Sequence, residues 1–417
     1  MKVILSKSGK KGKHITIHEL NEVNKLKRSI SNSTDIVDAK TDLEKIAGQE
    51  ITFPNLTDTS YAFANCPNLT TFNISIPNVT STSGMFDNCP NLTTFTAEIP
   101  SVTSTSYMFN GCAKLESFTT DMPLVNSASY MFYNCSNLKT FIADCPSLTN
   151  VDYMFSGCSN LNHVEINIPL ATSLYYTFYN AGNLETLNIT APNVTQIDYT
   201  FYNTKIKEFS LDFPKLTRAS YAFHNCQSLE KITSDFPNLA NGELMFYNCN
   251  KLKEISQYSY PLLTYGSYMF YCCKSLETFM KQTPKLNSAS HMFQDCSNLK
   301  EIGFNADNLT SAYYMFSGCS SLASFNNQST IKLRSAYYMF NRCSNLQSVD
   351  MNLSALYDGE HMFYGCSKLS TISVGSLNNL CYAFYMFYGC KLLPKFTINM
   401  PTVAQTYYMF YGCSNLE

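Results

Sequence analysis

Hydrophobic positions recur along this chain with a period of about 23 residues. The segment Tyr-Met-Phe-x-x-Cys-x-x-Leu returns sixteen times, and 347 residues separate the first repeat Phe from the last in 15 steps of 22 to 24. The repeat Phe positions are Phe63, Phe86, Phe109, Phe132, Phe155, Phe178, Phe201, Phe223, Phe246, Phe270, Phe293, Phe316, Phe340, Phe363, Phe387 and Phe410. Self-similarity at a fixed 20 to 30 residues is typical of a solenoid, in which each repeat packs on its neighbours.

Within each repeat, an aromatic or β-branched residue follows the Leu by three positions, as Phe141 follows Leu138. Apolar and polar residues then alternate up to a proline, as in Phe72 to Pro77. Period-2 alternation closed by Pro predicts one short β-strand per repeat, and we expect these strands to stack in parallel. The Tyr-Met-Phe-x-x-Cys segment is too short for a full helix, so we expect a turn of 3₁₀- or α-helix there, or a second extended arm.

The phrase Cys-x-x-Leu-x-x-Phe/Ile-x-x-x-x-Pro-x-Leu, together with Met-Phe-x-x-Cys, resembles the BspA-like leucine-rich repeats over residues 51–417. The usual phrase prefers Ala before the Phe, whereas Met holds that place in 12 of 16 copies here. The resemblance implies a curved α/β repeat solenoid with one short parallel strand per repeat. It also implies a surface or extracellular protein that binds other proteins or cells.

The chain divides into two segments of different character. Residues 1–50 lack the repeat, and Met1–Leu5 is a candidate strand. Apolar residues spaced between Ile15 and Ile30 predict an amphipathic helix, and a capping box at Thr41-x-x-Glu44 predicts a second. We interpret this segment as a small helical N-terminal cap, or as an attachment segment that joins a larger assembly.

The solenoid segment, residues 51–417, contains about 16 repeats and stops in mid-repeat at Glu417. A solenoid without a terminal cap leaves its hydrophobic ladders uncovered. We therefore expect that the C-terminus is truncated, or that another subunit or domain covers it.

Charge and hydropathy narrow the function classes. Lys and Arg total 29 against 31 Asp and Glu, and this near-neutral balance argues against nucleic-acid binding. No apolar run is long enough for a transmembrane helix. The N-terminus has no apolar stretch typical of a secretory signal peptide, although the resemblance implies a cell-surface or extracellular location. A virus-encoded attachment protein would also fit this composition.

The 17 cysteines are mostly explained by the repeat. Fourteen follow the repeat Phe by three positions, and ligands on one line cannot converge on a metal ion. We predict a ladder of buried thiols rather than a metal site or a disulfide framework. Cys145, Cys381 and the pair Cys272-Cys273 lie off the ladder or beside it and are the candidates for exposure.

Catalytic chemistry has no support in the sequence. His291 and His361 replace the repeat Tyr and are interpreted as variants of the repeat. We find no nucleophile-base pair, and the segment Ser8–Lys13 lacks the spacing of a phosphate-binding loop. We therefore expect no enzyme activity, no cofactor and no metal.

Tyrosine provides the most specific candidates for binding. Twelve of the 29 precede the repeat Phe by two positions, and eight directly follow it. Since Phe and Leu fill the core, some rings must lie outside, where Tyr suits recognition; a purely structural Tyr stack is the alternative, and both roles are compatible. The candidate ligand-binding residues are Tyr107, Tyr130, Tyr133, Tyr153, Tyr176, Tyr179, Tyr268, Tyr314, Tyr338 and Tyr408.

The outward face of the strands offers a second candidate surface. It is mostly small, neutral and rich in hydroxyl groups, which suits either a solvated strand face or a broad binding surface. The favoured function is a non-enzymatic recognition or adhesion protein that presents an extended surface to a protein or glycan. The alternative is a structural or host-attachment component of a virion or surface assembly.

Overall fold

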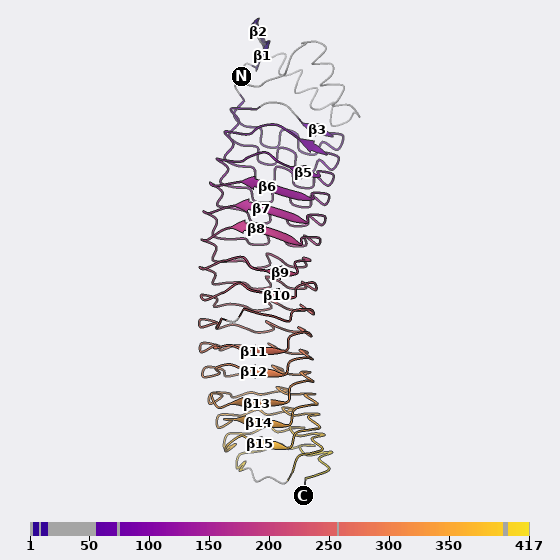
Figure 1. The fold of residues 1–417 in the computed structure, drawn as a ribbon, viewed down its shortest axis with the longest axis vertical. Helices are drawn as coiled ribbons and strands as arrows, with labels where there is room; N and C mark the ends of the chain where they lie inside the picture. The colour runs from indigo at the N-terminus through magenta and orange to yellow at the C-terminus, as the bar shows by residue number, and fades with distance from the viewer. Residues whose placement is uncertain are drawn as a thin grey trace. The chain divides into compact units, whose positions relative to one another are not determined.

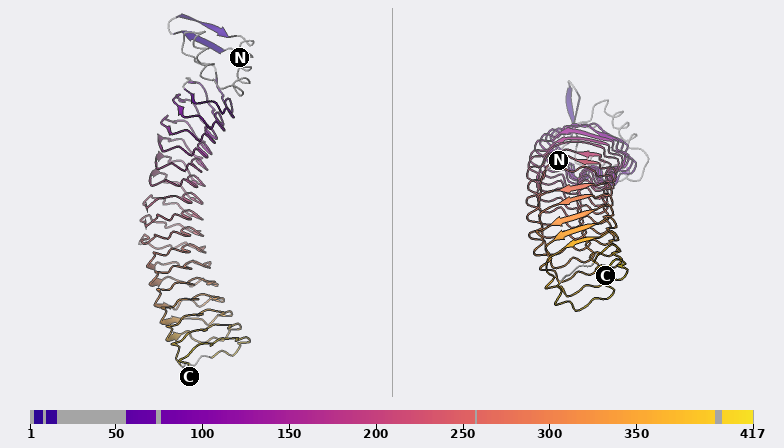
Figure 2. Two further views of the ribbon diagram at one scale, coloured as in Figure 1. Left: turned by 90° about the vertical axis from the view of Figure 1, so that its right-hand side faces the viewer. Right: turned by 60° about the horizontal axis from the view of Figure 1, so that its bottom comes forward.

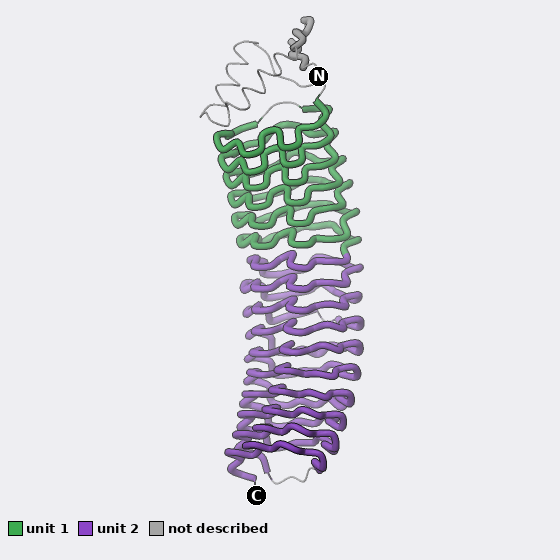
Figure 3. Tube along the Cα trace, turned by 180° about the vertical axis from the view of Figure 1, so that it is seen from behind, with its two compact units in different colours: residues 1–194 green, residues 195–417 purple. Residues whose placement is uncertain are grey.

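The computed structural model describes residues 3–7, 10–15, 56–72, 76–256, 258–394 and 399–416. It consists of two compact units, residues 1–194 and 195–417 (Figure 3). In each unit, successive repeats form stacked turns of a parallel β-solenoid, which we call rungs (Figure 1).

The described strands are short. They are β1 (Val3–Lys7), β2 (Lys10–Ile15), β3 (Thr71–Phe72), β4 (Thr94–Phe95), β5 (Ser117–Phe118), β6 (Thr140–Asp144), β7 (His163–Asn167), β8 (Thr186–Thr190), β9 (Glu208–Phe209), β10 (Lys231–Ile232), β11 (Thr278–Met280), β12 (Glu301–Gly303), β13 (Ser324–Asn327), β14 (Ser348–Met351) and β15 (Thr371–Ser373). Strands β1 and β2 form an antiparallel hairpin, so the predicted strand near the N-terminus is present.

Strands β3 to β15 follow the repeat, and the strands that pair do so in parallel, one rung apart. Within each unit the arrows of successive rungs point the same way (Figure 2). In unit 1, Phe118 pairs with Phe141, and Phe141 pairs with Val164. Strand β6 has alternating exposed and buried residues, with Phe141 inside. The period-2 pattern therefore predicted the inward positions correctly.

A second arm runs through each rung, five residues before the repeat Phe. There, single residues form parallel bridges between rungs, such as Ser104 with Ser127 in unit 1 and Ser311 with Ser335 in unit 2. This extended arm lies before the Tyr-Met-Phe-x-x-Cys segment, and the segment itself forms a series of tight turns, as in the bond from the Cys112 N–H to the Phe109 carbonyl. Neither predicted conformation of the segment, a turn of helix or an extended arm, is therefore found within the described residues.

The turns depend on two residues per rung with left-handed backbone. In the Phe109 rung, Tyr107 has φ 59° and Gly111 has φ 71°. The N–H groups of Tyr107, Phe109 and Gly111 donate to carbonyls of the next rung, at 2.8 to 2.9 Å. The intervening Met108 N–H bonds to Thr105 within its own rung at 3.0 Å, so alternate N–H groups join rungs and close turns.

The second left-handed position explains a composition bias in the repeat. Asn and Gly occupy it in thirteen of sixteen rungs, and Cys272, Asp295 and Arg342 fill the others. Gly adopts positive φ freely, and Asn and Asp do so more readily than other residues. The first left-handed position carries Tyr in twelve rungs, although bulky residues rarely adopt positive φ.

The interior is formed by stacked ladders of identical side chains. The repeat Phe rings stack one rung apart, with centroids 5.5 Å apart for Phe132 and Phe155. Strand rings meet them edge-on, as Phe141 meets Phe155 at 5.0 Å. Most of these side chains, and the repeat Leu and Cys, are fully buried.

The predicted α/β class is wrong for the described part of the chain, which contains no α-helix. Hydrogen-bonded turns replace helices because two left-handed residues per rung prevent continuous helical backbone. The cap helices predicted between Ile15 and Gly48 lie outside the described residues. The repeat after Phe246 has no strand among its described residues, and at the strand position there Glu254 forms a single bridge, to Lys231.

Candidate recognition surface

The Tyr column, the residues two positions before the repeat Phe, lies on the outside of each unit. The next two residues, such as Met108 and the repeat Phe109, are both buried in the core. The left-handed backbone at Tyr107 turns its ring outward, and 37 % of this residue is exposed. The sequence predicted that some Tyr rings lie outside the core, and rings of the Tyr column are among those that do.

In unit 1, four rings of the Tyr column form one stack. Ring centroids lie 4.6 Å apart for Tyr107 and Tyr130, 4.5 Å for Tyr130 and Tyr153, and 4.7 Å for Tyr153 and Tyr176. Adjacent planes differ by at most 14°. The four rings therefore form a nearly parallel pile along the rungs.

Two further candidates flank this stack. Tyr133 lies 5.6 Å from Tyr130, and Tyr179 lies 5.0 Å from Tyr176, both tilted. The six candidate residues of unit 1 thus form one surface. Tyr175, which the sequence did not single out, meets Tyr176 edge-on at 4.6 Å.

Unit 2 carries a longer stack in the same column, and two of its members are histidines. Seven rings follow one another with centroids 4.2 to 5.2 Å apart. They are Tyr268, His291, Tyr314, Tyr338, His361, Tyr385 and Tyr408. The four candidate residues of unit 2 therefore belong to one stack, although only Tyr314 and Tyr338 touch directly.

A second aromatic column, formed by residues that directly follow the repeat Phe, also stacks in unit 2. Tyr202, His224, Tyr247 and Tyr271 lie 4.5 to 4.6 Å apart in order. The sequence analysis missed His224 and Tyr385. Both stand at repeat positions where Tyr is usual, so the alignment of repeats was the signal that could have identified them.

The hydroxyl groups of these stacks remain protonated near neutral pH. Burial raises the pKa of Tyr130, Tyr153, Tyr314 and Tyr338 above the usual phenol value. Neighbouring rings cover the ring faces, so the stacks present ring edges and neutral hydroxyl groups to solvent. Such a row can donate and accept hydrogen bonds and bury apolar area.

The thiols are not part of this surface. Cys135 and Cys158 are fully buried, and each Sγ donates to a Phe carbonyl of the preceding rung at 3.0 Å. Burial raises the pKa of both thiols. All cysteines in the structure are free, as the ladder prediction required.

Two of the four cysteines expected to be exposed are so in part, and two are not. Cys272 and Cys381 are half-buried, whereas Cys145 and Cys273 are fully buried. Cys273 belongs to the buried ladder, and Cys145 occupies the inward position after β6, where other rungs of unit 1 carry Ile, Met or Ala.

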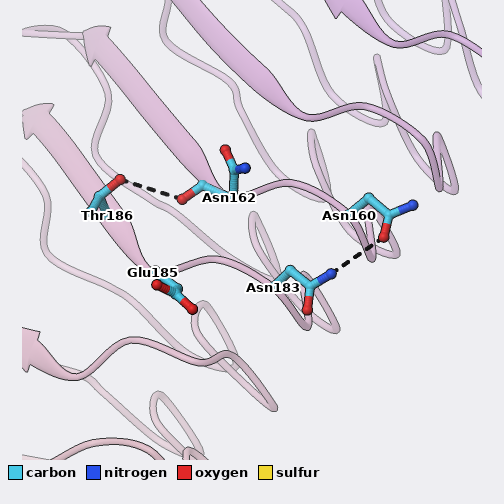
Figure 4. A pocket seen from close by; sticks show the side chains of 5 residues that line it. All are labelled: Asn160, Asn162, Asn183, Glu185 and Thr186. Carbon is cyan, nitrogen blue, oxygen red and sulfur yellow. Dashed lines mark hydrogen bonds between the residues drawn. The ribbon is translucent and has the colours of Figure 1, made fainter.

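Unit 1 has two shallow hollows beside its strands, one at the start of β7 and β8 and one across β6, β7 and β8. One, of about 390 Å³, is lined by Asn160, Asn162, Asn183, Glu185 and Thr186 (Figure 4). Asn183 donates to the side chain of Asn160 at 3.3 Å, and Thr186 donates to the carbonyl of Asn162 at 3.3 Å. This hollow is polar, and its amides are bonded to one another along the rungs.

The second hollow, of about 320 Å³, includes Ile142, which is 55 % exposed. In unit 2, Met280 is exposed at an equivalent outward position. The strand face is therefore less uniformly polar than the outward Thr and Asn residues suggested.

Within the described ranges, no group of three or more His, Cys, Asp or Glu side chains is arranged to hold a metal ion. In the same part of the chain, no helix is long and apolar enough to cross a membrane.

Comparisons with known proteins agree with the repeat architecture. The sequence matches the family described as BspA type leucine rich repeat region over residues 43–152, 146–239, 217–338 and 310–417. No curated protein sequence matches the chain.

Two of the solved structures with similar folds are leucine-rich repeat proteins from bacteria. A leucine-rich repeat protein from Bacteroides ovatus is 22 % identical, with 76 % of this chain and 82 % of that chain covered and a TM-score of 0.46. A leucine rich cell surface protein from Faecalibacterium prausnitzii is also 22 % identical, with coverage of 76 % and 83 % and a TM-score of 0.39.

Proposed function

Because this chain belongs to the BspA-type leucine-rich repeat family, we propose that it is a non-enzymatic recognition protein whose Tyr columns bind a protein ligand. Leucine-rich repeat proteins typically mediate protein interactions, and the choice of a protein as the ligand starts from this property. The single observation that carries the proposal is the seven-ring stack of unit 2, which repeats the surface of unit 1.

Stacked Tyr rings suit protein binding for a thermodynamic reason. Tyr supplies a large contact area with few rotatable bonds, and each ring here is already held between two others. Little side-chain entropy remains to be lost on binding, so more of the contact energy contributes to affinity.

The stack geometry favours a protein over a glycan. A sugar ring packs against the open face of an aromatic ring, but neighbours about 4.7 Å away cover the faces of Tyr314 and Tyr130. Ring edges and hydroxyl groups remain, and these complement the mixed apolar and polar surface of a protein. Binding to glycans is the competing outcome of the test below.

The proposed binding residues are the ten Tyr candidates of the two units. We assign Tyr107, Tyr130, Tyr133, Tyr153, Tyr176 and Tyr179 to the surface of unit 1, and Tyr268, Tyr314, Tyr338 and Tyr408 to that of unit 2. The proposed location is the cell surface or the extracellular space, in keeping with the family.

The test screens the full chain against a library of secreted and cell-surface protein domains and, in parallel, against a glycan array. The surface variant is Tyr314→Asn with Tyr338→Asn, because Asn tolerates positive φ and so removes the rings without new backbone strain. The control variant is Thr278→Ala with Thr371→Ala, two exposed residues of the strand face.

We expect protein hits that the surface variant loses and the control variant retains. Glycan hits without protein hits would overturn the choice of ligand class. Protein hits lost only in the control variant would instead assign binding to the strand face.

A further inference from the structure

Three histidines replace Tyr inside the aromatic stacks of unit 2, and each lies between two nearly parallel rings. His224 lies 4.6 Å from Tyr202 and 4.5 Å from Tyr247. His361 lies 4.2 Å from Tyr338 and 4.8 Å from Tyr385. Histidine is the ring that gains a charge just below neutral pH, so these stacks contain titratable members that a Tyr stack lacks.

At two of the three histidines, a second ring proton would have no hydrogen-bond acceptor. The Nδ1 atoms of His224 and His361 are buried and have no hydrogen-bond partner among the described residues. The neutral ring fits this environment when its proton is on Nε2. Protonation places an unpaired donor and a charge between two rings, which costs free energy despite the attraction of a cation to π-systems.

His291 provides an internal comparison. It lies 4.3 Å from Tyr268 and 4.9 Å from Tyr314, as the others do in their stacks. Its Nδ1 is bonded to the side-chain oxygen of Gln294, so Nδ1 is already the donor. A second proton on Nε2 therefore leaves no buried donor unpaired at Nδ1.

Burial opposes protonation at both His224 and His361, and a neighbouring carboxylate partly offsets that effect at His361. Burial lowers the pKa of His224 to about 4, and the phenols of Tyr202, Tyr221 and Tyr247 surround it without a charged contributor in the described part of the chain. Burial also lowers the pKa of His361.

The rung of His361 carries two carboxyl groups besides the neighbouring phenols of Tyr338, Tyr364 and Tyr385. Asp358 favours the protonated ring and so opposes the effect of burial. Burial raises the pKa of Glu360 itself, which reduces its charge in mild acid. The response of His361 is therefore expected to be smaller than that of His224.

We propose that His224 and His361 make the aromatic surface of unit 2 acid-sensitive, so that protonation loosens both stacks and weakens the binding they support. The part of this inference that concerns binding rests on the recognition role proposed above. The loosening of the stacks does not, because it is a property of the chain alone.

The sign follows from proton linkage. A His whose folded pKa lies below its unfolded value of 6.5 stabilises the closed state fully above that value and loses this contribution as pH falls toward the folded pKa. For His224, the pKa of about 4 corresponds to a shift of the local closing equilibrium of at most about 30-fold at pH 5. The window is therefore from about pH 6.5 down to about pH 4.

The test is hydrogen-exchange mass spectrometry of the full chain at pH 7.5 and pH 5.0, corrected for intrinsic exchange rates. We expect acid to increase opening severalfold in peptides spanning residues 202–247 and 338–385. The variant His224→Tyr with His361→Tyr restores the usual residue of each column and should abolish the increase. The control variant His291→Tyr should leave the acid response of these peptides unchanged.

An unchanged acid response in the double variant would overturn the proposal, as would loss of that response in the control variant. The two proposals can fail separately. If the exchange results agree but no protein ligand is found, the recognition role fails while the acid-sensitive stacks stand. If a ligand binds equally at both pH values, only the link between the stacks and binding fails.

Discussion

Each rung builds two aromatic stacks, one inside and one outside, and they differ in ways that separate folding from recognition. Inside unit 1, Phe132 and Phe155 are buried with centroids 5.5 Å apart. Outside, Tyr130 and Tyr153 of the same rungs are half-buried and only 4.5 Å apart. The outer rings therefore lie closer together than the inner rings of the same two rungs.

The two stacks also differ in how strictly the repeat specifies them. Phe occupies the inner position in all sixteen repeats, whereas the Tyr column also carries Gly84, Leu244, His291 and His361. A buried stack leaves a cavity when a ring is lost, and a surface stack does not. The outer column is therefore free to vary without opening a cavity in the core.

The largest expected effect on stability comes from removing a ring of the inner Phe stack. Phe132→Ala should lower the free energy of unfolding of its region by about 3–5 kcal/mol, because it leaves a cavity between Phe109 and Phe155. Urea denaturation followed by circular dichroism measures this loss. The matched control is Tyr130→Asn in the same rung, which should cost less than about 1 kcal/mol; an equal cost would mean that the outer stack is also structural.

The alkylation rates of the cysteines distinguish buried from partly exposed positions in the wild-type chain. The thiolate is the reactive form, and burial raises the pKa of Cys135 and limits reagent access. We expect iodoacetamide to alkylate the half-buried Cys381 at least about 100-fold faster than Cys135 in the native chain. Peptide mass spectrometry over time gives both rates, and comparable rates would show that the Cys ladder is open.

Alkaline titration probes the outer stack directly. Because burial raises the pKa of Tyr130 and Tyr314, these hydroxyl groups stay protonated to higher pH in the folded state than in the unfolded chain. Their contribution to stability is complete below pH 10 and is lost as pH rises beyond it. Tyrosinate absorbance should therefore appear at higher pH in the native chain than in urea, and coincident curves would contradict stacking in solution.

The smallest expected effect concerns the left-handed position after the repeat Phe. Asn134 has φ 58°, so Asn134→Ala should cost about 1 kcal/mol, because Ala adopts left-handed backbone less readily than Asn does. Asn134→Gly should be nearly neutral. Urea midpoints of the two variants decide this, and equal midpoints would show that the backbone conformation is not what selects Asn.

The repeat period predicted the inward residues well because burial depends on spacing alone. Phe141 and Val164 lie where the alternation placed them, and the Cys ladder is buried as expected. The family expectation for the repeat region was also correct.

The turns were harder to predict because their conformation depends on hydrogen bonds between rungs. Nothing intrinsic to Tyr107 favours positive φ; its N–H bond to Ser129 of the next rung holds it there. The column of Asn and Gly that includes Asn134 and Gly157 was a usable signal for left-handed backbone. The histidines of the stacks can be recognised only when the repeats are aligned with one another, because no local sequence motif marks them.

The central claim is that the outer stack serves binding while the inner stack holds the fold, and one paired measurement tests it. Affinity for the captured protein ligand and urea stability are measured for the wild-type chain and for Tyr314→Asn with Tyr338→Asn. The account predicts at least about a tenfold loss of affinity, or 1.4 kcal/mol, with a stability change below about 1 kcal/mol. Unchanged affinity, or a stability loss as large as that of Phe132→Ala, would contradict it.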